Sequence, residues 1–234
     1  MKRLMLLSNS TNHGREYLDH AMPEVLAFLG PIKRLLFVPF AGSDRTLYTE
    51  KVKDRFAKEG IEVDGLIPLS GGARAIEAAE AVFVGGGNTF RLIDRLQRGR
   101  YLEPLRRRAL EGMPYLGASA GSVIAAPSIK TTNDMPIVQP QWFEGLALVP
   151  FQINAHYIDA DPSSRHMGET REQRIREFHE ENDESVVGLR EGGWLRVEGD
   201  SVRLEGGASA RLFRKGKDPV EVSPGSAIDP LLAG

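Results

Sequence analysis

Short apolar runs alternate with amphipathic segments along the first two-thirds of the chain, and this alternation constrains the fold more than any other feature of the sequence. It is the pattern of strand and helix units around a mostly parallel sheet. Buried strands are predicted at 4–7, 32–40, 61–67, 81–84 and 114–117. Helices are predicted at 15–29, 46–58, 73–80, 88–97 and 102–111. The sequence therefore predicts an α/β fold, with a mostly parallel central sheet flanked by helices.

The pattern changes after residue 126. Segments 131–136 and 157–168 are polar and longer than ordinary connections between strands and helices, and loops of this size often carry function. From Val186 onward the sequence favours antiparallel hairpin strands, at 194–197, 202–204 and 210–213. We expect a single domain over residues 1–222, its sheet edged by these hairpins, and a loose C-terminal tail over 223–234.

The charge balance and the absence of cysteine exclude several classes of function. The chain carries 30 Lys and Arg residues against 32 Asp and Glu, so it lacks the basic surplus typical of proteins that bind nucleic acid or anionic membranes. Without cysteine it can form no disulfide, thiolate nucleophile or Cys-ligated zinc site. The apolar run at the N-terminus is shorter than the core of a signal peptide. We expect a cytoplasmic protein with no nucleic-acid or membrane partner.

A G-x-S-x-G motif spans residues 117–121, between a predicted buried strand and a short helix of small residues at 120–126. A serine at such a strand-to-helix turn is held with its hydroxyl exposed above the sheet, beside N–H groups that can bind an oxyanion. Ser119 is therefore the candidate nucleophile. Two other interpretations stay open: the motif is an ordinary tight turn, or the nucleophile is Ser122, one turn into the helix.

A serine nucleophile needs a base, and the chain offers five histidines: His13, His20, His156, His166 and His179. His20 and His179 lie on predicted helices among charged residues, whereas His13 and His166 lie in polar loops. His156 follows the apolar run 146–153 and leaves a strand end, where sites collect in folds of this kind. His156 is the candidate base; the alternative is a packed or solvent-capped histidine.

A second glycine-rich turn, at 85–87, joins a predicted buried strand to a helix N-terminus and runs into Asn88 and Thr89. Bare N–H groups at such a turn can bind an anion. The segment lacks the Gly-Lys-Ser/Thr of a phosphate loop and the full spacing of a dinucleotide site. Beside an elbow serine, it suits an oxyanion hole, for instance one formed by the N–H groups of Gly87 and Ala120. The alternative is a glycine turn without a ligand.

Residues 170–173 fit a helix capping box, which places Arg171 in the first helical turn. A cation there opposes the helix dipole at a modest cost, so Arg171 is a candidate for binding an anionic substrate. The other interpretation is a solvated arginine on a helix that also carries Glu172, Arg174 and Arg176.

Six segments together resemble the peptidase E family, the α-aspartyl dipeptidases: 85–89, 117–121, 131–138, 154–156, 168–175 and 188–192. The joint order of Asn-Asp-Met-Pro-Ile-Val and Gly-Glu-Thr-Arg-Glu-Gln-Arg-Ile makes the resemblance specific. It implies a cofactor-free, metal-free cytoplasmic serine peptidase whose fold is similar to that of class I glutamine amidotransferases, with a serine in place of the cysteine. It also implies cleavage of dipeptides that begin with aspartate.

Position by position, the resemblance implies Ser119 as nucleophile, His156 as base, and Gly87 and Ala120 as oxyanion donors. We expect Arg171 to pair with the aspartyl side chain of the substrate. The full set of residues expected to contact the substrate is Arg171, Asn88, Thr89 and Glu169.

For the third catalytic residue the resemblance offers two acids, Glu191 and Asp134. Glu191 follows the predicted strand 185–190, and an acid at a strand end is well fixed for holding an imidazole tautomer, so we favour Glu191. Asp134, in a polar loop, then contacts the substrate α-amino group or a loop element. The reverse assignment stays open, and so does plain surface charge for either acid. The chain order Ser, His, Glu differs from the Ser, acid, His order of α/β-hydrolases.

The expected reaction is therefore acyl transfer to Ser119 and hydrolysis of the acyl-enzyme, with a small Asp-X peptide as substrate and the protein as a monomer or homodimer. We expect loop 157–168 to help close the pocket. Two alternatives remain. One is a hydrolase of the same fold acting on another acidic substrate, such as a cyanophycin-type peptidase or an acyl hydrolase. The other is a non-catalytic module that binds an anion at 85–87.

Overall fold

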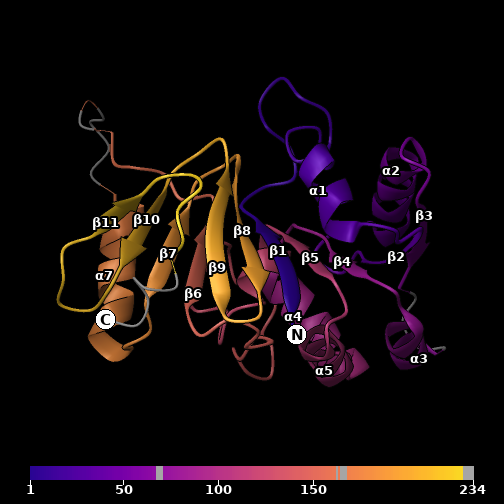
Figure 1. Cartoon of the computed structure of the whole chain (residues 1–234). Coiled ribbons are helices and arrows are strands. Elements are labelled where there is room, and N and C mark those ends of the chain that lie inside the picture. Colours follow the sequence, from indigo (N-terminus) through magenta and orange to yellow (C-terminus); the bar gives the residue numbers. More distant parts are fainter. Residues whose placement is uncertain (67–70, 162, 164–167, 229–234) are drawn as a thin grey trace.

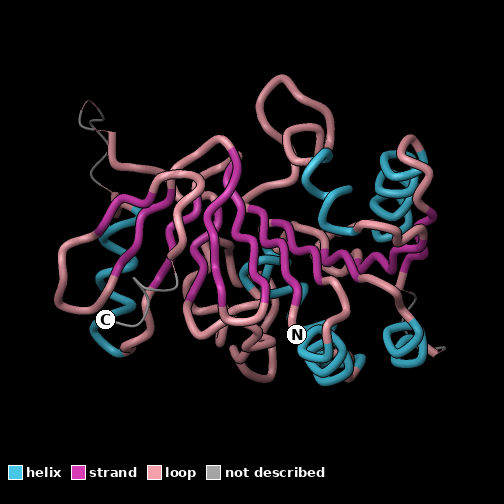
Figure 2. Tube along the Cα trace, in the orientation of Figure 1, coloured by secondary structure: helices cyan, strands magenta, loops and turns pink. Residues whose placement is uncertain are grey.

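The structure is a computed structural model that describes residues 1–66, 71–161, 163 and 168–228. Within them the strands form two sheets, a large one and a smaller one, which lie side by side in Figures 1 and 2. Helices cover both faces of the large sheet, and one helix packs on the smaller sheet. The expected mixed α/β architecture is confirmed.

The large sheet has seven strands in the order β3-β2-β4-β5-β1-β8-β9, of which the first five are parallel. Strand β8 pairs antiparallel with β1, and β9 pairs antiparallel with β8, as expected for strands near the C-terminus. Their bounds, in that order, are Glu62–Gly65, Arg34–Val38, Val82–Val84, Tyr115–Ala118, Arg3–Leu7, Gly193–Glu198 and Ser201–Gly206.

The smaller sheet has the order β11-β10-β7-β6. Its bounds, in that order, are Val220–Val222, Ala210–Phe213, Val186–Leu189 and Gln152–Ala155. The strands after residue 186 therefore divide between two sheets, instead of all edging one sheet as the sequence pattern suggested. Burial pattern identifies a strand but not its partner, because the partner is chosen by contacts distant in sequence.

Seven helices occur in the described residues: α1 Met22–Leu29, α2 Arg45–Ala57, α3 Gly72–Ala78, α4 Thr89–Gly99, α5 Leu102–Glu111, α6 Ala120–Val123 and α7 Arg171–Glu181. Helices α1 and α2 bury their apolar faces in one core cluster with Met5 and Leu7 of β1. Helices α3, α4 and α5 pack in a second cluster with Leu4 and Leu6. Alternate residues of β1 thus face opposite layers, as the pleat of a central strand requires.

Helix α1 is shorter than the predicted segment 15–29. Pro23 lies in its first turn, and a proline further inside a helix would remove a hydrogen bond and clash with the preceding turn. Leu18 has a φ of 61°, and its N–H donates to the Ser10 carbonyl at 2.7 Å. The chain before Met22 therefore forms turns rather than helix.

Part of the expected C-terminal tail is attached to the large sheet. Leu204 of β9 donates its N–H to the Ser226 carbonyl at 2.9 Å, and Ile228 donates to Val202 at 2.8 Å. The Ile228 side chain is only 1% exposed. Residues 223–228 are therefore held against β9 by hydrogen bonds and by the buried Ile228 rather than loose, while 229–234 lie outside the described residues.

The parallel strands end at one edge of the large sheet. Leu7 at the end of β1 is opposite Ala118 at the end of β5, and Val84 at the end of β4 is opposite Gly117. The residues that follow these three strands therefore meet at this edge, where sites in open α/β sheets form.

Candidate active site

Ser119 lies on a sharp turn between β5 and α6, with φ 52° and ψ −113°. The two glycines of the motif are required by close backbone approach. A Cβ on Gly117 would lie 2.7 Å from the Gly121 carbonyl oxygen, and a Cβ on Gly121 would lie 2.1 Å from the carbonyl oxygen of Val84. The turn can close only with glycine at both positions, and it fixes Ser119 at the edge of the sheet.

His156 comes directly after β6 and brings its ring to Ser119. The Nε2 atom lies 2.8 Å from Ser119 Oγ, and Nδ1 lies 2.6 Å from Oε1 of Glu191. Glu191 follows β7, the parallel neighbour of β6. A carboxylate that accepts a hydrogen bond from the Nδ1 N–H leaves Nε2 as the acceptor for the serine hydroxyl, so the three side chains form a line of hydrogen bonds along which a proton can move from serine to histidine.

The line is open to solvent on one side, because the His156 and Glu191 side chains are 39% and 53% exposed. A substrate can therefore reach the imidazole. Ser122, the rival serine, is fully buried and its hydroxyl donates to the Leu7 carbonyl at 2.6 Å. Because it is buried and already hydrogen-bonded within the fold, the Ser122 hydroxyl is not placed to attack a substrate.

Of the other histidines, the three in the described residues form no hydrogen bond with Ser119, His156 or Glu191. His179 is buried, with Nε2 3.1 Å from the Glu184 carbonyl, and His13 is exposed in a turn. His20 precedes α1, and burial lowers its pKa. His166 lies outside the described residues.

Asp134 lies at the N-terminus of α4 rather than beside His156. Its Oδ2 accepts hydrogen bonds from the Thr89 N–H at 2.7 Å, the Thr89 hydroxyl at 2.6 Å and the Thr132 hydroxyl at 3.2 Å. Within the described residues, Oδ1 accepts no hydrogen bond and His156 has none with Asp134. Of the two acids, Glu191 is thus the one within reach of the imidazole.

Asn88 and Thr89 support this arrangement. Asn88 caps α4 by accepting from the Arg91 N–H at 3.0 Å, and its amide group donates to the Met135 carbonyl at 2.8 Å. Thr89 contributes both of its donors to Asp134. These two residues therefore bind the polar loop to the start of the helix.

The glycine turn after β4 lies against the candidate nucleophile. A Cβ on Gly86 would lie 3.0 Å from Ser119 Cβ and 3.6 Å from its Oγ. Gly87 has a φ of 131°, and a Cβ there would lie 2.7 Å from the Ala41 carbonyl oxygen. Within the part of the chain that the structure describes, neither the Gly87 nor the Ala120 N–H has a hydrogen-bond partner. Both are available to an oxyanion.

Arg171 is the first residue of α7, and the predicted capping box is present. The Thr170 hydroxyl accepts from the Gln173 N–H at 3.1 Å, and the Gln173 side chain accepts from the Thr170 N–H at 2.7 Å. Burial and then the charge of Arg174 lower the pKa of Arg171, whereas the charge of Asp134 raises it. Arg171 has no ion pair among the described residues.

Glu169 has a different environment from Arg171. Its carboxylate lies 3.5 Å from Arg174, and both side chains are about half exposed, at 55% and 50%. Loop 157–168, expected to close the pocket, is described only in part, because 162 and 164–167 lie outside the described residues.

Sequence reasoning missed Ser8 and Asn9, which follow β1 at the same sheet edge. Both are buried, and the Ser8 hydroxyl accepts a hydrogen bond from the His156 N–H at 2.9 Å. The available signal was a pair of polar residues directly after the first predicted buried strand. Such residues are expected at the site edge of a parallel sheet.

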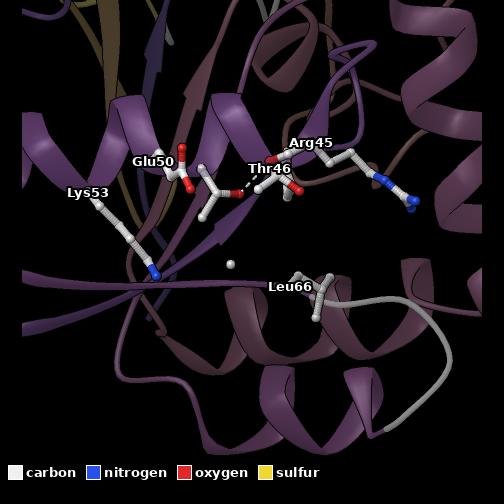
Figure 3. A pocket seen from close by; sticks show the side chains of 8 residues that line it. Arg45, Thr46, Glu50, Lys53 and Leu66 are labelled. Atoms are coloured by element: carbon white, nitrogen blue, oxygen red, sulfur yellow. Dashed lines mark hydrogen bonds between the residues drawn. The ribbon is translucent and has the colours of Figure 1, made fainter.

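A separate pocket beside α2 contains no comparable chemistry. It is lined by Pro39, Arg45, Thr46, Thr49, Glu50, Lys53, Gly65 and Leu66 (Figure 3). The hydrogen bond drawn there joins the Thr49 hydroxyl to the Arg45 carbonyl within the helix. With charges of both signs and neither serine nor histidine in its lining, this pocket offers no nucleophile and base pair.

None of the helices in the described residues has the length and apolar character needed to cross a bilayer. That part of the chain also holds no group of three His, Asp or Glu side chains placed to bind a metal ion.

Comparison with known proteins gives extensive matches. The model of peptidase family S51 matches residues 4–205. A Streptomyces coelicolor protein named peptidase E is 55% identical over 229 residues, which cover 98% of this chain and 94% of that one. A Drosophila melanogaster protein named "Probable alpha-aspartyl dipeptidase" is 44% identical over 226 residues, covering 95% of this chain and 94% of the relative.

A solved structure of a peptidase from an acI-B1 Actinobacterium matches with a TM-score of 0.74 and 17% identity, over 97% of this chain and 96% of that one. At this identity the likeness concerns the fold alone. The family match and the two sequence relatives confirm the resemblance found in the sequence. The chain belongs to peptidase family S51.

Proposed function

We propose that this protein is a serine dipeptidase that hydrolyses dipeptides with an N-terminal aspartate. The observation that carries the proposal is the line from Ser119 Oγ to His156 Nε2, at 2.8 Å, and from His156 Nδ1 to Glu191 Oε1, at 2.6 Å. Membership of family S51 supports the peptidase activity, and the name of the Drosophila relative supports the substrate class.

In the first half of the reaction, Ser119 Oγ attacks the carbonyl carbon of the peptide bond and its proton passes to His156 Nε2. Glu191 accepts a hydrogen bond from the Nδ1 N–H, which stays on the imidazole, and its charge stabilises the imidazolium that forms. The N–H groups of Gly87 and Ala120 donate to the carbonyl oxygen as it becomes negative. The leaving amine then takes the Nε2 proton as the carbon–nitrogen bond breaks, and an aspartyl ester of Ser119 remains.

In the second half, a water molecule gives its proton to His156 Nε2 and attacks the ester carbonyl. The same two N–H groups stabilise the second oxyanion, and the serine oxygen leaves with the Nε2 proton. Free aspartate is released and Ser119 regains its hydroxyl. The side chains return to their starting protonation states, so one base serves both halves.

Recognition of the substrate rests on two opposite charges. An N-terminal aspartyl residue carries an α-ammonium group and a side-chain carboxylate. Arg171, which lacks an ion-pair partner in the described residues, pairs with the carboxylate, and the free Oδ1 of Asp134 accepts from the ammonium group. Thr89 donates two hydrogen bonds to Asp134, and Asn88 donates to the carbonyl of the next residue, Met135. Asn88, Thr89 and Glu169 stay in the proposal as further residues that contact the substrate.

The experiment is a substrate panel of dipeptides that begin with Asp, Asn, Glu or Leu and share one second residue, assayed with the wild type and Ser119→Ala. We expect hydrolysis of the Asp dipeptide, and a loss of on the order of 10⁴-fold or more in the variant. Labelling with a serine-reactive phosphonate should modify Ser119 in the wild type and also in Ser122→Ala. An Asp dipeptide that is not cleaved, or a fully active Ser119→Ala, would contradict the proposal.

β-Linked aspartyl peptides and esters belong in the same panel. Preference for either over Asp dipeptides would favour the same-fold hydrolase of another acidic substrate. The absence of any adduct on Ser119 would favour the anion-binding module. The aligned Ser119, His156 and Glu191 side chains support catalysis over binding alone.

The setting is part of the proposal. We propose a cytoplasmic protein acting on small peptides without nucleic acid, as a monomer or homodimer with one domain over residues 1–222. The balanced charge of 30 basic against 32 acidic residues supports the absence of a nucleic-acid partner. Light scattering coupled to size-exclusion chromatography determines the mass in solution.

A further inference from the structure

Three consecutive residues at the end of β1 contact the three segments of the proposed triad. We call them the β1 end: Leu7, Ser8 and Asn9. All three are buried, with exposures of 0%, 0% and 2%. The strand lies between β5 and β8, so the β1 end is at the centre of the sheet edge that carries the site.

Each residue of the β1 end accepts a hydrogen bond from a different catalytic segment. The Leu7 carbonyl accepts from the Ser119 N–H at 3.0 Å. The Ser8 hydroxyl accepts from the His156 N–H at 2.9 Å. The Asn9 side-chain oxygen accepts from the N–H of Gly192, the residue after Glu191, at 2.9 Å.

The Ser8 hydroxyl also donates to the carbonyl of Leu189, the last residue of β7, at 2.7 Å. It therefore joins the end of β6, where His156 begins, to the end of β7, which leads to Glu191. Ser119 directly follows β5 of the large sheet, whereas β6 and β7 belong to the smaller one. The β1 end connects the nucleophile of one sheet to the base and acid of the other.

His156 needs such a support because its backbone has a φ of 53°, a conformation that is unfavourable for a residue with a side chain. A strained conformation persists only when surrounding contacts impose it. Without the hydroxyl, the His156 N–H loses its buried partner and the residue can relax toward negative φ. The imidazole would then move away from Ser119 Oγ.

We propose that Ser8 is a positioning residue for catalysis, acting through the backbone of His156. The inference rests on the proposed function, in which His156 is the base. It predicts that loss of the Ser8 hydroxyl impairs proton transfer while substrate binding at Arg171 and Asp134 is retained. A displacement of about 1 Å in a catalytic group can reduce the rate by roughly 100-fold.

The test compares Ser8→Ala with Ser128→Ala. Ser128 is a matched control, because it is also buried and its hydroxyl accepts from the side chain of Gln152 on β6 at 2.9 Å. We expect Ser8→Ala to lower kcat for an Asp dipeptide by at least about 10-fold, with KM within about twofold of the wild type. Its rate of reaction with a serine-reactive phosphonate should fall in parallel. Ser128→Ala should keep the wild-type values of kcat and labelling rate.

Urea unfolding of both variants separates positioning from general stability. Equal kcat in Ser8→Ala and Ser128→Ala overturns the inference, and so does a loss in Ser8→Ala that is confined to KM. If Ser8→Ala does not fold, Ser8→Cys replaces the hydroxyl with a weaker hydrogen-bonding thiol of similar size. We expect the same loss of kcat there, and wild-type kcat overturns the inference.

Ser119→Ala, assayed in parallel, distinguishes failure of the proposed role of Ser8 from failure of the proposed function. An inactive Ser119→Ala with an unaffected Ser8→Ala leaves the proposed function standing and removes the role of Ser8. A fully active Ser119→Ala removes the proposed function, and the positioning inference with it.

Discussion

Ser119 and His156 both have positive φ angles, 52° and 53°, although neither is glycine. Each such residue costs roughly 1–3 kcal/mol unless its surroundings compensate. Positive φ alone does not mark the site, since Leu18, Arg100 and Ala147 share it. What distinguishes Ser119 and His156 is that their N–H groups are both held by the β1 end, at 3.0 and 2.9 Å. The geometry of the site is therefore imposed by neighbours as well as by the local turn.

We expect Arg171 to determine the preference for an aspartyl side chain in the substrate. Replacing it with Met removes the partner of the substrate carboxylate, and breaking a desolvated charge pair costs about 3–5 kcal/mol. We expect Arg171→Met to lower kcat/KM for an Asp dipeptide by roughly 100-fold or more, and to affect the matching Asn dipeptide far less. The measurement is kcat/KM for both dipeptides.

Arg176→Met is the control for this prediction, because Arg176 lies on the same helix, is 66% exposed and pairs with Glu172. It should leave the ratio of the two kcat/KM values unchanged. An equal decrease in kcat/KM for the Asp and Asn dipeptides in Arg171→Met would show that Arg171 does not recognise the charge of the substrate side chain.

Glu191 and Asp134 have different partners, so their substitution should affect different kinetic constants. Glu191 is 2.6 Å from His156 Nδ1, whereas Asp134 binds the start of α4. Glu191→Gln keeps the shape but cannot stabilise the imidazolium, so kcat should fall by about 10²- to 10⁴-fold with little change in KM. Asp134→Asn should mainly raise KM. Full kinetic curves for both variants at one pH decide the matter, and a kcat defect confined to Asp134→Asn would reverse the assignment.

At the scale of elements, the features that the sequence predicted are local ones. The strand, the glycine turn and the helix around Ser119 lie within ten residues, so their pattern is visible in the sequence, and so is the capping box at Thr170. The contact of Ser8 with His156 spans 148 positions. No local pattern encodes such a pairing, because it depends on β1 entering the sheet beside β5 and β8.

Arg190 connects the segments that follow His156 and precede Glu191. Its guanidinium binds Asp159 through two hydrogen bonds of 2.8 Å and Glu221 at 2.5 Å, and it lies 5.5 Å from the ring centre of Tyr157. The hydrogen bonds from Arg190 are the largest cause that lowers the pKa of Asp159 and of Glu221. This network ties the loop after β6 to β7 and β11.

These pKa shifts predict that the contribution of Arg190 to the free energy of unfolding depends on pH. An acid whose pKa is lower in the folded state stabilises the fold above its unfolded pKa, near 4, and this stabilisation is lost as pH falls through the folded pKa. Arg190→Met should therefore lower the free energy of unfolding most at neutral pH, by about 1 kcal/mol. The effect is small because the Asp159 and Glu221 side chains are 47% and 52% exposed, and solvent screens the charges.

Urea unfolding at neutral pH and near pH 3 measures the effect, and the difference between wild type and Arg190→Met should shrink at the acidic value. Arg34→Met is the control, since Arg34 pairs with Asp64 at 2.6 Å and the two side chains are 63% and 53% exposed. Arg34→Met should lower the free energy of unfolding at neutral pH by less than Arg190→Met does. A difference for Arg190→Met that stays constant with pH would show that the acids do not contribute.

At the scale of the whole molecule, the two sheets share one hydrophobic core. Leu6 of β1 and Val84 of β4 belong to the same buried cluster as Ile153 of β6 and Val187 of β7. The site lies where the sheets meet, with Ser119 from one and His156 from the other. A shared core is the physical basis for expecting residues 1–222 to behave as one domain.

The last prediction tests this coupling with Ile153→Ala, in a Trp142→Phe background that leaves Trp194 of β8 as the single tryptophan. Ile153 is fully buried, so the substitution should lower the free energy of unfolding by about 2–5 kcal/mol. If the sheets unfold together, the urea midpoint reported by Trp194 fluorescence falls, and hydrogen exchange of β7 amides accelerates by the equivalent amount. Ile158→Ala, the same substitution at a side chain that is 62% exposed, should change both by less than about 0.5 kcal/mol. Faster exchange in β7 with an unchanged Trp194 midpoint would mean that the smaller sheet opens independently, and His156 could then separate from Ser119 without unfolding of the large sheet.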